Sequence, residues 1–197
     1  MIFENLNKKI YCTDPVFDKI YPKAYQEHSA RHFTPVKIAV KAAKLLVDDP
    51  ADKILDIGSG VGKFCCIGAS VTNAQFYGVE MRKTLTNLSN KIKRNYKIKN
   101  AHFINSDFTK LDFKKYNGIY FFNSFHEYFD SSCVLDETSK VSLQAYEKFH
   151  DDLILKLNEC NSGTKLVTFH TFKKRIPSTY QFIDANETGL LKFYIKK

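Results

Sequence analysis

A turn built on three glycines is the feature that most constrains what this chain can fold into. Gly58, Gly60 and Gly62 lie between the apolar run 53–57, which predicts a buried strand, and the stretch 61–71, which predicts a helix. Glycine permits a close backbone approach, and the amides at a helix N-terminus face whatever lies beyond the turn. The sequence therefore predicts a strand, a glycine turn and a helix, with a ligand site beyond the carboxyl end of the strand.

The chain after residue 53 alternates short β-rich runs with amphipathic helical stretches. This alternation is typical of parallel strands joined by helical crossovers. Further strands are expected at 75–80, 102–104, 118–122 and 166–169, helices over 85–96 and from about 138 to 159, and a terminal antiparallel hairpin at 180–183 and 190–195. The sequence therefore predicts an α/β fold with a doubly wound, seven-stranded mixed sheet.

A length of 197 residues with 44% hydrophobic content suits one full domain. We expect residues 34–197 to form this domain and residues 1–33 to form a short helical extension. Thr34 is predicted to cap a helix with Pro35 in its first turn, where the missing N–H costs nothing. Phe33 and Thr34 are expected to fold over the open end of the ligand site as a lid.

Two common nucleotide-binding motifs do not fit the glycine turn. A dinucleotide fingerprint would need glycine at position 63, where the chain has Lys63. A phosphate-binding P-loop would need Ser or Thr after the Gly62–Lys63 pair, where the chain has Phe64. Nicotinamide binding and nucleotide hydrolysis are therefore both disfavoured.

Acidic residues at the ends of the predicted strands indicate a nucleoside ligand. Glu80 ends the second strand, where a carboxylate can accept both hydroxyls of a ribose. Asp107 and Phe108 follow the third strand and offer an acceptor for an adenine amino group and an aromatic face. Asp56, at a buried strand position, needs a partner, and a cationic ligand amine would suit it. The alternative is structural: a tight turn, a solvated strand end and a core aromatic.

In this order, the glycine turn, Glu80 and Asp107 resemble the class I S-adenosylmethionine-dependent methyltransferases, over roughly residues 33–128. The resemblance implies that Asp56, Gly58 and Gly60 hold the methionine moiety, Glu80 the ribose, and Asp107 with Phe108 the adenine. The remaining residues expected to contact the cofactor are Thr34, Ser59 and Asn123.

Four motifs look most similar to the Dot1-type histone-lysine methyltransferases. They are the runs 56–62, 78–80, 107–108 and 123–125. That group carries Asn-Asn-Phe where this chain has Asn123-Ser124-Phe125, and this chain shows no long basic extension. Both departures argue against a histone substrate.

Methyl transfer depends mainly on positioning, which is worth up to roughly 7–11 kcal/mol, and it needs no covalent enzyme nucleophile. Asn123 follows the fourth strand and is the candidate for orienting the acceptor. His126 or Glu127 beside it is the candidate general base. The alternative is that His126 and Glu127 begin a surface loop. The other histidines have no metal-ligand spacing, and we expect no metal site.

The formal net charge is +9, and its strongest local source lies between Met81 and Lys99. This segment holds no acidic residue and seven basic ones: Arg82, Lys83, Lys91, Lys93, Arg94, Lys97 and Lys99. The run fits either a nucleic-acid footprint or the solvated face of an amphipathic helix.

We expect a protein side chain or a small molecule as methyl acceptor ahead of nucleic acid. An RNA or DNA methyltransferase is the alternative, and a non-catalytic protein that keeps the cofactor fold as a scaffold is another. Five cysteines without CxxC spacing indicate reduced thiols. With no signal peptide or membrane-length apolar run, the sequence predicts a cytoplasmic protein.

Overall fold

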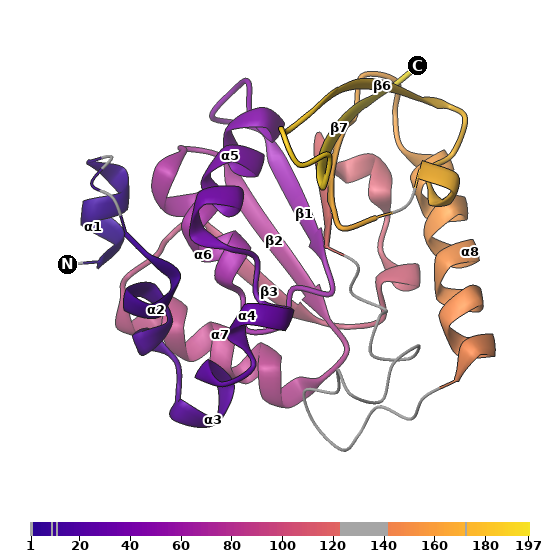
Figure 1. The fold of residues 1–197 in the computed structure, drawn as a ribbon. Coiled ribbons are helices and arrows are strands. Elements are labelled where there is room, and N and C mark those ends of the chain that lie inside the picture. Colours follow the sequence, from indigo (N-terminus) through magenta and orange to yellow (C-terminus); the bar gives the residue numbers. More distant parts are fainter. Residues whose placement is uncertain (1, 9, 11, 123–141, 172) are drawn as a thin grey trace.

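The computed structural model describes residues 2–8, 10, 12–122, 142–171 and 173–197. A single twisted sheet runs through the molecule with helices on both of its faces (Figure 1). The strands are β1 (Lys53–Ile57), β2 (Gln75–Glu80), β3 (Ala101–Asn105), β4 (Gly118–Phe122), β5 (Lys165–Phe169), β6 (Tyr180–Ala185) and β7 (Leu191–Lys196). The expected α/β fold with a seven-stranded mixed sheet is confirmed.

The strand order is β3-β2-β1-β4-β5-β7-β6. The first five strands in this order pair in parallel, and β7 pairs antiparallel with both β5 and β6. The order reverses between β1 and β4, and open α/β sheets bind their ligands beyond the carboxyl ends of the strands at such a switch point. The topology therefore places the end of β1, and the glycine turn after it, where a ligand site is expected.

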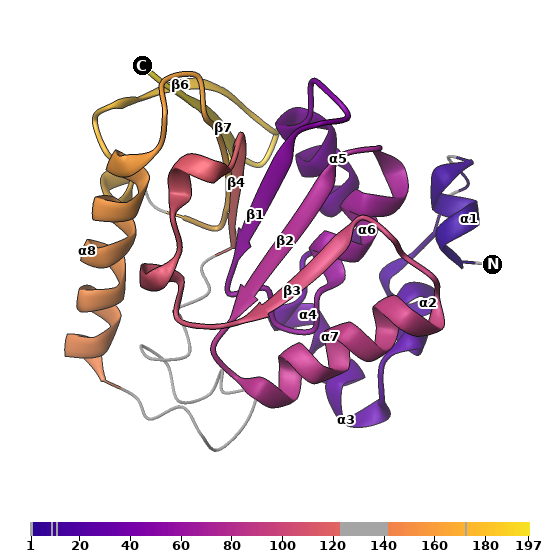
Figure 2. The same cartoon turned by 180° about the vertical axis from the view of Figure 1, so that it is seen from behind.

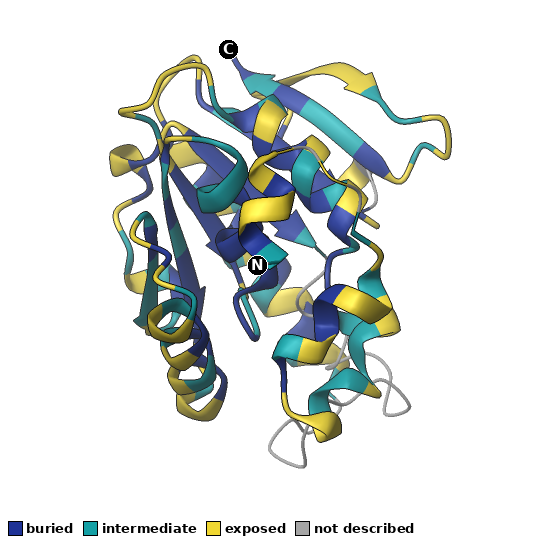
Figure 3. Cartoon of the chain, turned by 90° about the vertical axis from the view of Figure 1, so that its left-hand side faces the viewer, coloured by how far each residue is buried: buried dark blue, intermediate teal, exposed yellow. Residues whose placement is uncertain are grey.

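Two hydrophobic clusters hold the helices to the sheet. One face carries α5 (Val36–Leu46), α6 (Lys63–Val71) and α7 (Lys83–Asn95), whose apolar side chains share one cluster with the N-terminal segment. The other face carries α8 (Leu143–Glu159) with the short turns η2 (Phe108–Lys110) and η3 (Phe113–Lys115). Figure 2 shows this second face and Figure 3 the buried strands between the layers.

The N-terminal segment forms short helices beside α6. They are α1 (Ile2–Asn7), α2 (Asp14–Phe17), η1 (Asp18–Ile20), α3 (Lys23–Gln26) and α4 (Ser29–His32); a further short turn, η6, spans Lys173–Arg175. Phe17 and Tyr21 are buried in the same cluster as α5 and α6, so this segment is packed into the core of the domain. The domain boundary after residue 33 stays a prediction.

Three helix starts differ from the expectations. Pro35, not Thr34, is the residue that precedes α5, and the capping acceptor comes from outside the helix, since Asp14 Oδ1 accepts the Val36 amide at 2.8 Å. The α6 helix begins at Lys63, because Gly62 before it has a left-handed backbone with φ of +79°. The described part of α8 begins after Ser142, whose hydroxyl accepts the Ala145 N–H at 3.2 Å; residues 138–141 lie outside the described residues.

Two features are absent from the described residues: a membrane-spanning helix and a cluster of metal-binding side chains. None of their helices is long and apolar enough to cross a membrane. They also hold no group of three His, Cys, Asp or Glu side chains that could bind a metal ion.

Candidate active site

The glycine turn is fastened to the end of the neighbouring strand β2. The backbone amides of Gly58 and Ser59 both donate to the carbonyl of Val79, at 2.9 and 3.0 Å. The Gly62 amide then donates to the Ser59 carbonyl at 2.9 Å and closes the turn. Gly58, Gly60 and Gly62 have φ of +69°, +53° and +79°, a left-handed region that favours glycine. The sequence-predicted turn is therefore also required by backbone geometry.

A fourth glycine, in the middle of β2, lets the turn come this close. A Cβ at Gly78 would lie 2.6 Å from Ser59 Oγ, so the Ser59 side chain occupies the space that any other residue would fill. Around Gly60, by contrast, a Cβ would meet nothing within 4 Å. The turn is thus packed against β2 on one side and open beside Gly60. Gly78 was noted only as part of the run 78–80, although glycine inside a strand often marks a close backbone approach.

Asp56 is a buried carboxylate at the carboxyl half of β1. Its side chain is 4% exposed, and the Cys65 thiol donates to its Oδ2 at 3.5 Å. Burial raises the pKa of Asp56 to about 7; the hydrogen bond from Cys65 opposes this shift, and the charge of Glu80 adds to it. A cationic group bound next to Asp56 would favour the ionised form and so gain a charge-assisted contact.

Glu80 lies across the turn from Asp56, at the end of β2, and its carboxylate is held by three N–H groups. Oε2 accepts the Gly60 amide at 3.1 Å. Oε1 accepts the backbone amide of Arg82 at 2.9 Å and the guanidinium Nε of Arg82 at 3.1 Å. Because the side chain is only 6% exposed, these contacts fix its orientation. The ion pair with Arg82 was not foreseen, because the sequence offers Arg82 only as part of a basic run.

Asp107 and Phe108 follow β3 and have different surroundings. Asp107 is partly exposed, and its Oδ1 accepts the Thr109 amide at 2.9 Å at the start of η2. Phe108 is 3% exposed, with ring centroids 6.5 and 6.4 Å from those of Phe113 and Phe149. Its ring therefore belongs to the core beneath the site in this structure. The expected stacking of Phe108 on an adenine stays a prediction.

Thr34 links the N-terminal segment to the sheet through its side chain. Its hydroxyl lies 3.0 Å from the Tyr120 hydroxyl, and the Tyr120 ring stacks on Phe64 with centroids 3.9 Å apart. Thr34 and Phe33 are both about 5% exposed. They hold the start of α5 against β4 and α6, and their role as a lid stays a prediction.

The sequence-predicted catalytic residues Asn123, His126 and Glu127 lie outside the described residues. The same is true of Ser124 and Phe125. Asn123 immediately follows Phe122, the last residue of β4, and β4 is the direct neighbour of β1 in the sheet. Because β4 runs parallel to β1, β4 ends at the same edge of the sheet as β1, and the role of Asn123 stays a prediction.

A family of methyltransferase domains matches residues 48–174, more than half of the chain. The chain belongs to this family. The match begins just before β1 and includes the glycine turn, Glu80 and Asp107. No curated protein matches the methyltransferase by sequence.

Solved structures of other methyltransferases share the fold. An RNA methyltransferase from Salinibacter ruber, in complex with S-adenosyl-L-homocysteine, has a TM-score of 0.57 and 16% identity, over 83% of this chain and 91% of that one. TrmN from Thermus thermophilus has a TM-score of 0.58 and 14% identity, over 87% of this chain and 51% of that one. An S-adenosylmethionine-dependent methyltransferase from Geobacter sulfurreducens, also in complex with S-adenosyl-L-homocysteine, has a TM-score of 0.51 and 15% identity, over 75% of this chain and 55% of that one.

These matches confirm the class I methyltransferase fold, the methyltransferase class and S-adenosylmethionine as the cofactor of the family. They do not support the narrower resemblance to the Dot1-type enzymes, which stays a prediction from four motifs. They also leave the acceptor unidentified.

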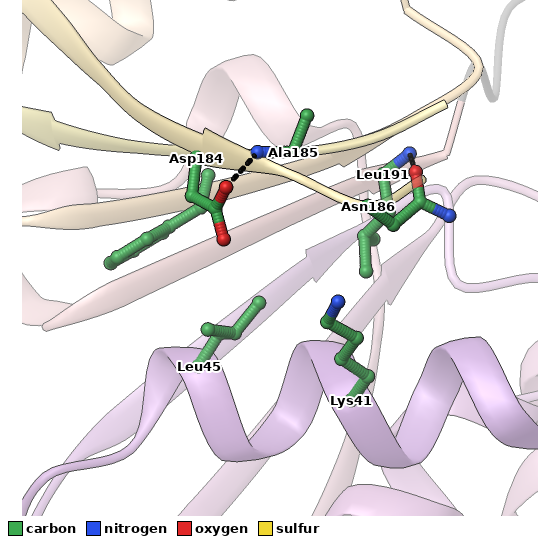
Figure 4. Close-up of a pocket in the computed structure, with 7 residues that line it drawn as sticks. Lys41, Leu45, Asp184, Ala185, Asn186 and Leu191 are labelled. Atoms are coloured by element: carbon green, nitrogen blue, oxygen red, sulfur yellow. Dashed lines mark hydrogen bonds between the residues drawn. The ribbon is translucent and has the colours of Figure 1, made fainter. Parts of the chain in front are cut away.

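A small hollow lies away from this site, between α5 and the β6–β7 hairpin (Figure 4). Its cavity volume is about 10 Å³, far less than the roughly 300–1,000 Å³ of small-molecule sites. The residues that line it are Lys41, Leu45, Asp184, Ala185, Asn186, Leu191 and Phe193. None is a predicted site residue, and the hollow is too small for the cofactor.

Lys63, the residue that excluded a dinucleotide fingerprint, ties the methyltransferase's N-terminal segment to the glycine turn. It is 3% exposed, and its Nζ lies 2.6 Å from Asp14 Oδ1 and 2.7 Å from Asp18 Oδ1. Asp14 Oδ1 also accepts the Val36 amide at 2.8 Å, at the start of α5. The lysine thus joins α2, η1 and α5 to the first residue of α6. No local signal in the sequence pairs residues that are 49 positions apart.

We predict that Lys63→Met destabilises the methyltransferase by about 3–5 kcal/mol, because it leaves buried Asp18 without its cation. Urea denaturation measures the change, with the exposed Lys53→Met as matched control, expected within about 0.5 kcal/mol of wild type. Adding Asp18→Asn to Lys63→Met should recover part of the loss. If Lys63→Met is as stable as Lys53→Met, the ion cluster contributes nothing to the fold.

Proposed function

We propose that this methyltransferase binds S-adenosylmethionine at the carboxyl edge of β1 and β2 and transfers its methyl group to an acceptor held beside β4. One observation carries the proposal: the buried Asp56 and Glu80 carboxylates lie at the ends of adjacent strands, with the open backbone of Gly60 beside them. The bound cofactor supplies an electrophilic methyl group on a sulfonium.

The residues present fit this cofactor. Asp56 is a buried acid that accepts a hydrogen bond from the Cys65 thiol and from no other described side chain, so a ligand ammonium group would complete its surroundings. Glu80 is the acceptor for ribose hydroxyls, and Asp107 is the acceptor for the adenine amino group. Gly58, Ser59 and Gly60 form the backbone wall, where Ser59 Oγ is buried and has no hydrogen-bond partner in the described part of the chain. Thr34 and Asn123 complete the proposed contacts.

The Glu80→Ala variant should bind S-adenosyl-L-homocysteine more weakly by about 1–3 kcal/mol, because charge-assisted hydrogen bonds are lost. Glu80→Gln should lose less, since its amide oxygen can still accept the Gly60 N–H. Calorimetry measures both, with the exposed Glu187→Ala as control at wild-type affinity. Tight binding of NAD and none of the methyl donor would refute the proposal.

Affinity for S-adenosyl-L-homocysteine should rise as the pH rises to about 7 and then level off. Asp56, with its pKa of about 7 in the free protein, must lose its proton to pair with the ligand ammonium. Well below pH 7 the slope should approach about tenfold per unit. Calorimetry in two buffers of different ionisation enthalpy should detect proton release, and Asp56→Asn should abolish it. Unchanged affinity between pH 5.5 and 8 would remove Asp56 from the site.

The same pKa shift fixes how stability depends on pH. The folded pKa of about 7 lies above the ordinary value of 3.8, so the unfolded chain loses this proton first. Asp56 therefore makes the free protein less stable as pH rises from about 4 to 7, and its effect is constant above that range.

Asn123 is proposed to orient the acceptor, because an amide can both donate and accept hydrogen bonds without exchanging a proton. His126 or Glu127 is the proposed base for an acceptor that carries a proton at neutral pH. These roles rest on chain position after β4.

Asn123→Ala should lower the rate of methyl transfer far more than it weakens cofactor binding, because the lost contact acts mainly in the transition state. The rate is measured as tritiated methyl incorporated into fractionated lysate, in samples treated with nuclease, with protease or with neither. The matched control is Asn73→Ala, at an exposed position. His126→Ala should show a smaller loss, which extends through neutral pH if His126 is the base. Full turnover with lost donor affinity in Asn123→Ala would move Asn123 to the cofactor pocket.

The second part of the proposal concerns the methyl acceptor. A protein side chain or small molecule is the expectation from the sequence, with nucleic acid as the alternative. The exposed basic surface of α7, which begins three residues after Glu80, favours the alternative. The fold similarity to an RNA methyltransferase from Salinibacter ruber is compatible with it.

A further inference from the structure

One face of α7 and the turn after it carry exposed positive charges and no negative ones. The α7 basic face consists of the exposed side chains of Lys83, Lys91, Arg94, Lys97 and Lys99. With partly exposed Arg82 and Lys93, residues 81–99 carry seven positive charges and no negative ones, against a net charge of +9 for the whole chain. Most of the positive excess is therefore concentrated in a tenth of the sequence.

No described acidic side chain lies within ion-pair distance of the α7 basic face. Among the described residues, Arg82 of this segment pairs with Glu80, inside the site. Lys91 and Arg94 are three positions apart, a spacing at which like charges on a helix repel. Lys83 opens the helix, where a positive charge opposes the helix dipole. Arg94, in the last turn of α7, has a favourable position relative to the helix dipole. No described carboxylate pairs with the α7 basic face, so its charge is available to a partner.

The helix itself is held by its opposite side. Leu85, Ser89 and Ile92 are buried against the rest of the domain, and Ser89 Oγ donates to the Gly60 carbonyl at 3.1 Å. Lys83, Lys91 and Arg94 fall within about 80° of one another around the axis, at 100° per residue. The basic side chains thus form a stripe on a helix fixed to the glycine turn.

The stripe begins at the candidate active site and runs away from it. Arg82, whose guanidinium contacts Glu80, immediately precedes the helix, and Figure 2 shows α7 leading away from the carboxyl ends of β2 and β3. Its 13 residues span about 20 Å, over which one strand of a nucleic-acid duplex carries roughly six phosphates. A chain of phosphates bound along α7 would therefore lead to the reaction centre.

We propose that the α7 basic face binds the phosphate backbone of a nucleic acid, most directly RNA presented as a single strand, and so guides an acceptor base to the site. The inference rests on the proposed function, since it names the acceptor class of the same site. The contacts are to phosphates, so they position the strand and carry no sequence specificity of their own.

The test compares two variants that remove the same charge. One carries Lys83→Gln, Lys91→Gln, Arg94→Gln and Lys99→Gln. The control carries four exposed lysines elsewhere changed to glutamine: Lys44, Lys53, Lys114 and Lys197. The probe is a fluorescein-labelled, 20-nucleotide single-stranded RNA of mixed sequence, and fluorescence anisotropy gives Kd at several KCl concentrations.

The α7 variant should bind the RNA at least about tenfold more weakly than wild type at low salt. The slope of log affinity against log salt concentration should become less steep by about 3, because four phosphate contacts are lost. The control should stay within about twofold of wild type. Equal losses in both variants would overturn the inference, because they would report net charge alone. Wild type that binds poly-glutamate as tightly as the RNA would overturn it too, and point to an acidic protein.

Calorimetry with S-adenosyl-L-homocysteine separates this inference from the proposed function. Both variants should keep wild-type affinity, which also shows that they are folded. Absence of cofactor binding in wild type would refute the proposed function, whatever the RNA data show. Cofactor binding without selective RNA loss in the α7 variant would refute only the nucleic-acid surface.

Discussion

The hydrogen bonds that hold the glycine turn to the end of β2 are the constraint on which the rest of the site depends. One carbonyl, that of Val79, accepts two consecutive amides of the turn, and the Gly60 amide reaches Glu80. The contact is possible because Gly78 leaves room for the Ser59 side chain. It holds the turn next to Glu80, on the strand adjacent to that of Asp56. A side chain at Gly78 would push Ser59 away from β2 and so separate the turn from Glu80.

A second set of contacts secures the turn from outside the sheet. Lys63 begins α6 directly after the turn and is surrounded by Asp14, Asp18 and the ring of Phe17, 5.4 Å from its Nζ. Burying a lysine is costly unless it is paired, and two carboxylates from the N-terminal segment supply the pairing. The N-terminal helices therefore do more than extend the domain, since they neutralise a charge that the α6 helix carries into the core.

The sequence was sufficient for the sheet and for the acids at strand ends, because both follow from local patterns. Glu80 was predicted as a strand-end carboxylate and lies there beside the turn. Contacts between distant residues were not predictable: nothing local pairs Lys63 with Asp14, and Thr34, expected to cap a helix, instead meets Tyr120, 86 positions away. Phe108 shows a third limit, because an aromatic after a strand can face the ligand or the core, and packing against α8 decides.

Arg82 connects the chemistry of the site to the charge of the surface. Its backbone amide and Nε both donate to Glu80 Oε1, so part of the Glu80 charge is compensated before any ligand arrives. This leaves Oε2, shared with Gly60, as the oxygen better able to accept from a ribose. The same residue immediately precedes α7, where the uncompensated positive charges begin. Because Arg82 is paired with Glu80, the positive potential along α7 arises beyond the site. In the proposed complex, α7 would therefore attract phosphates, while Glu80 would offer the cofactor's ribose a fixed acceptor.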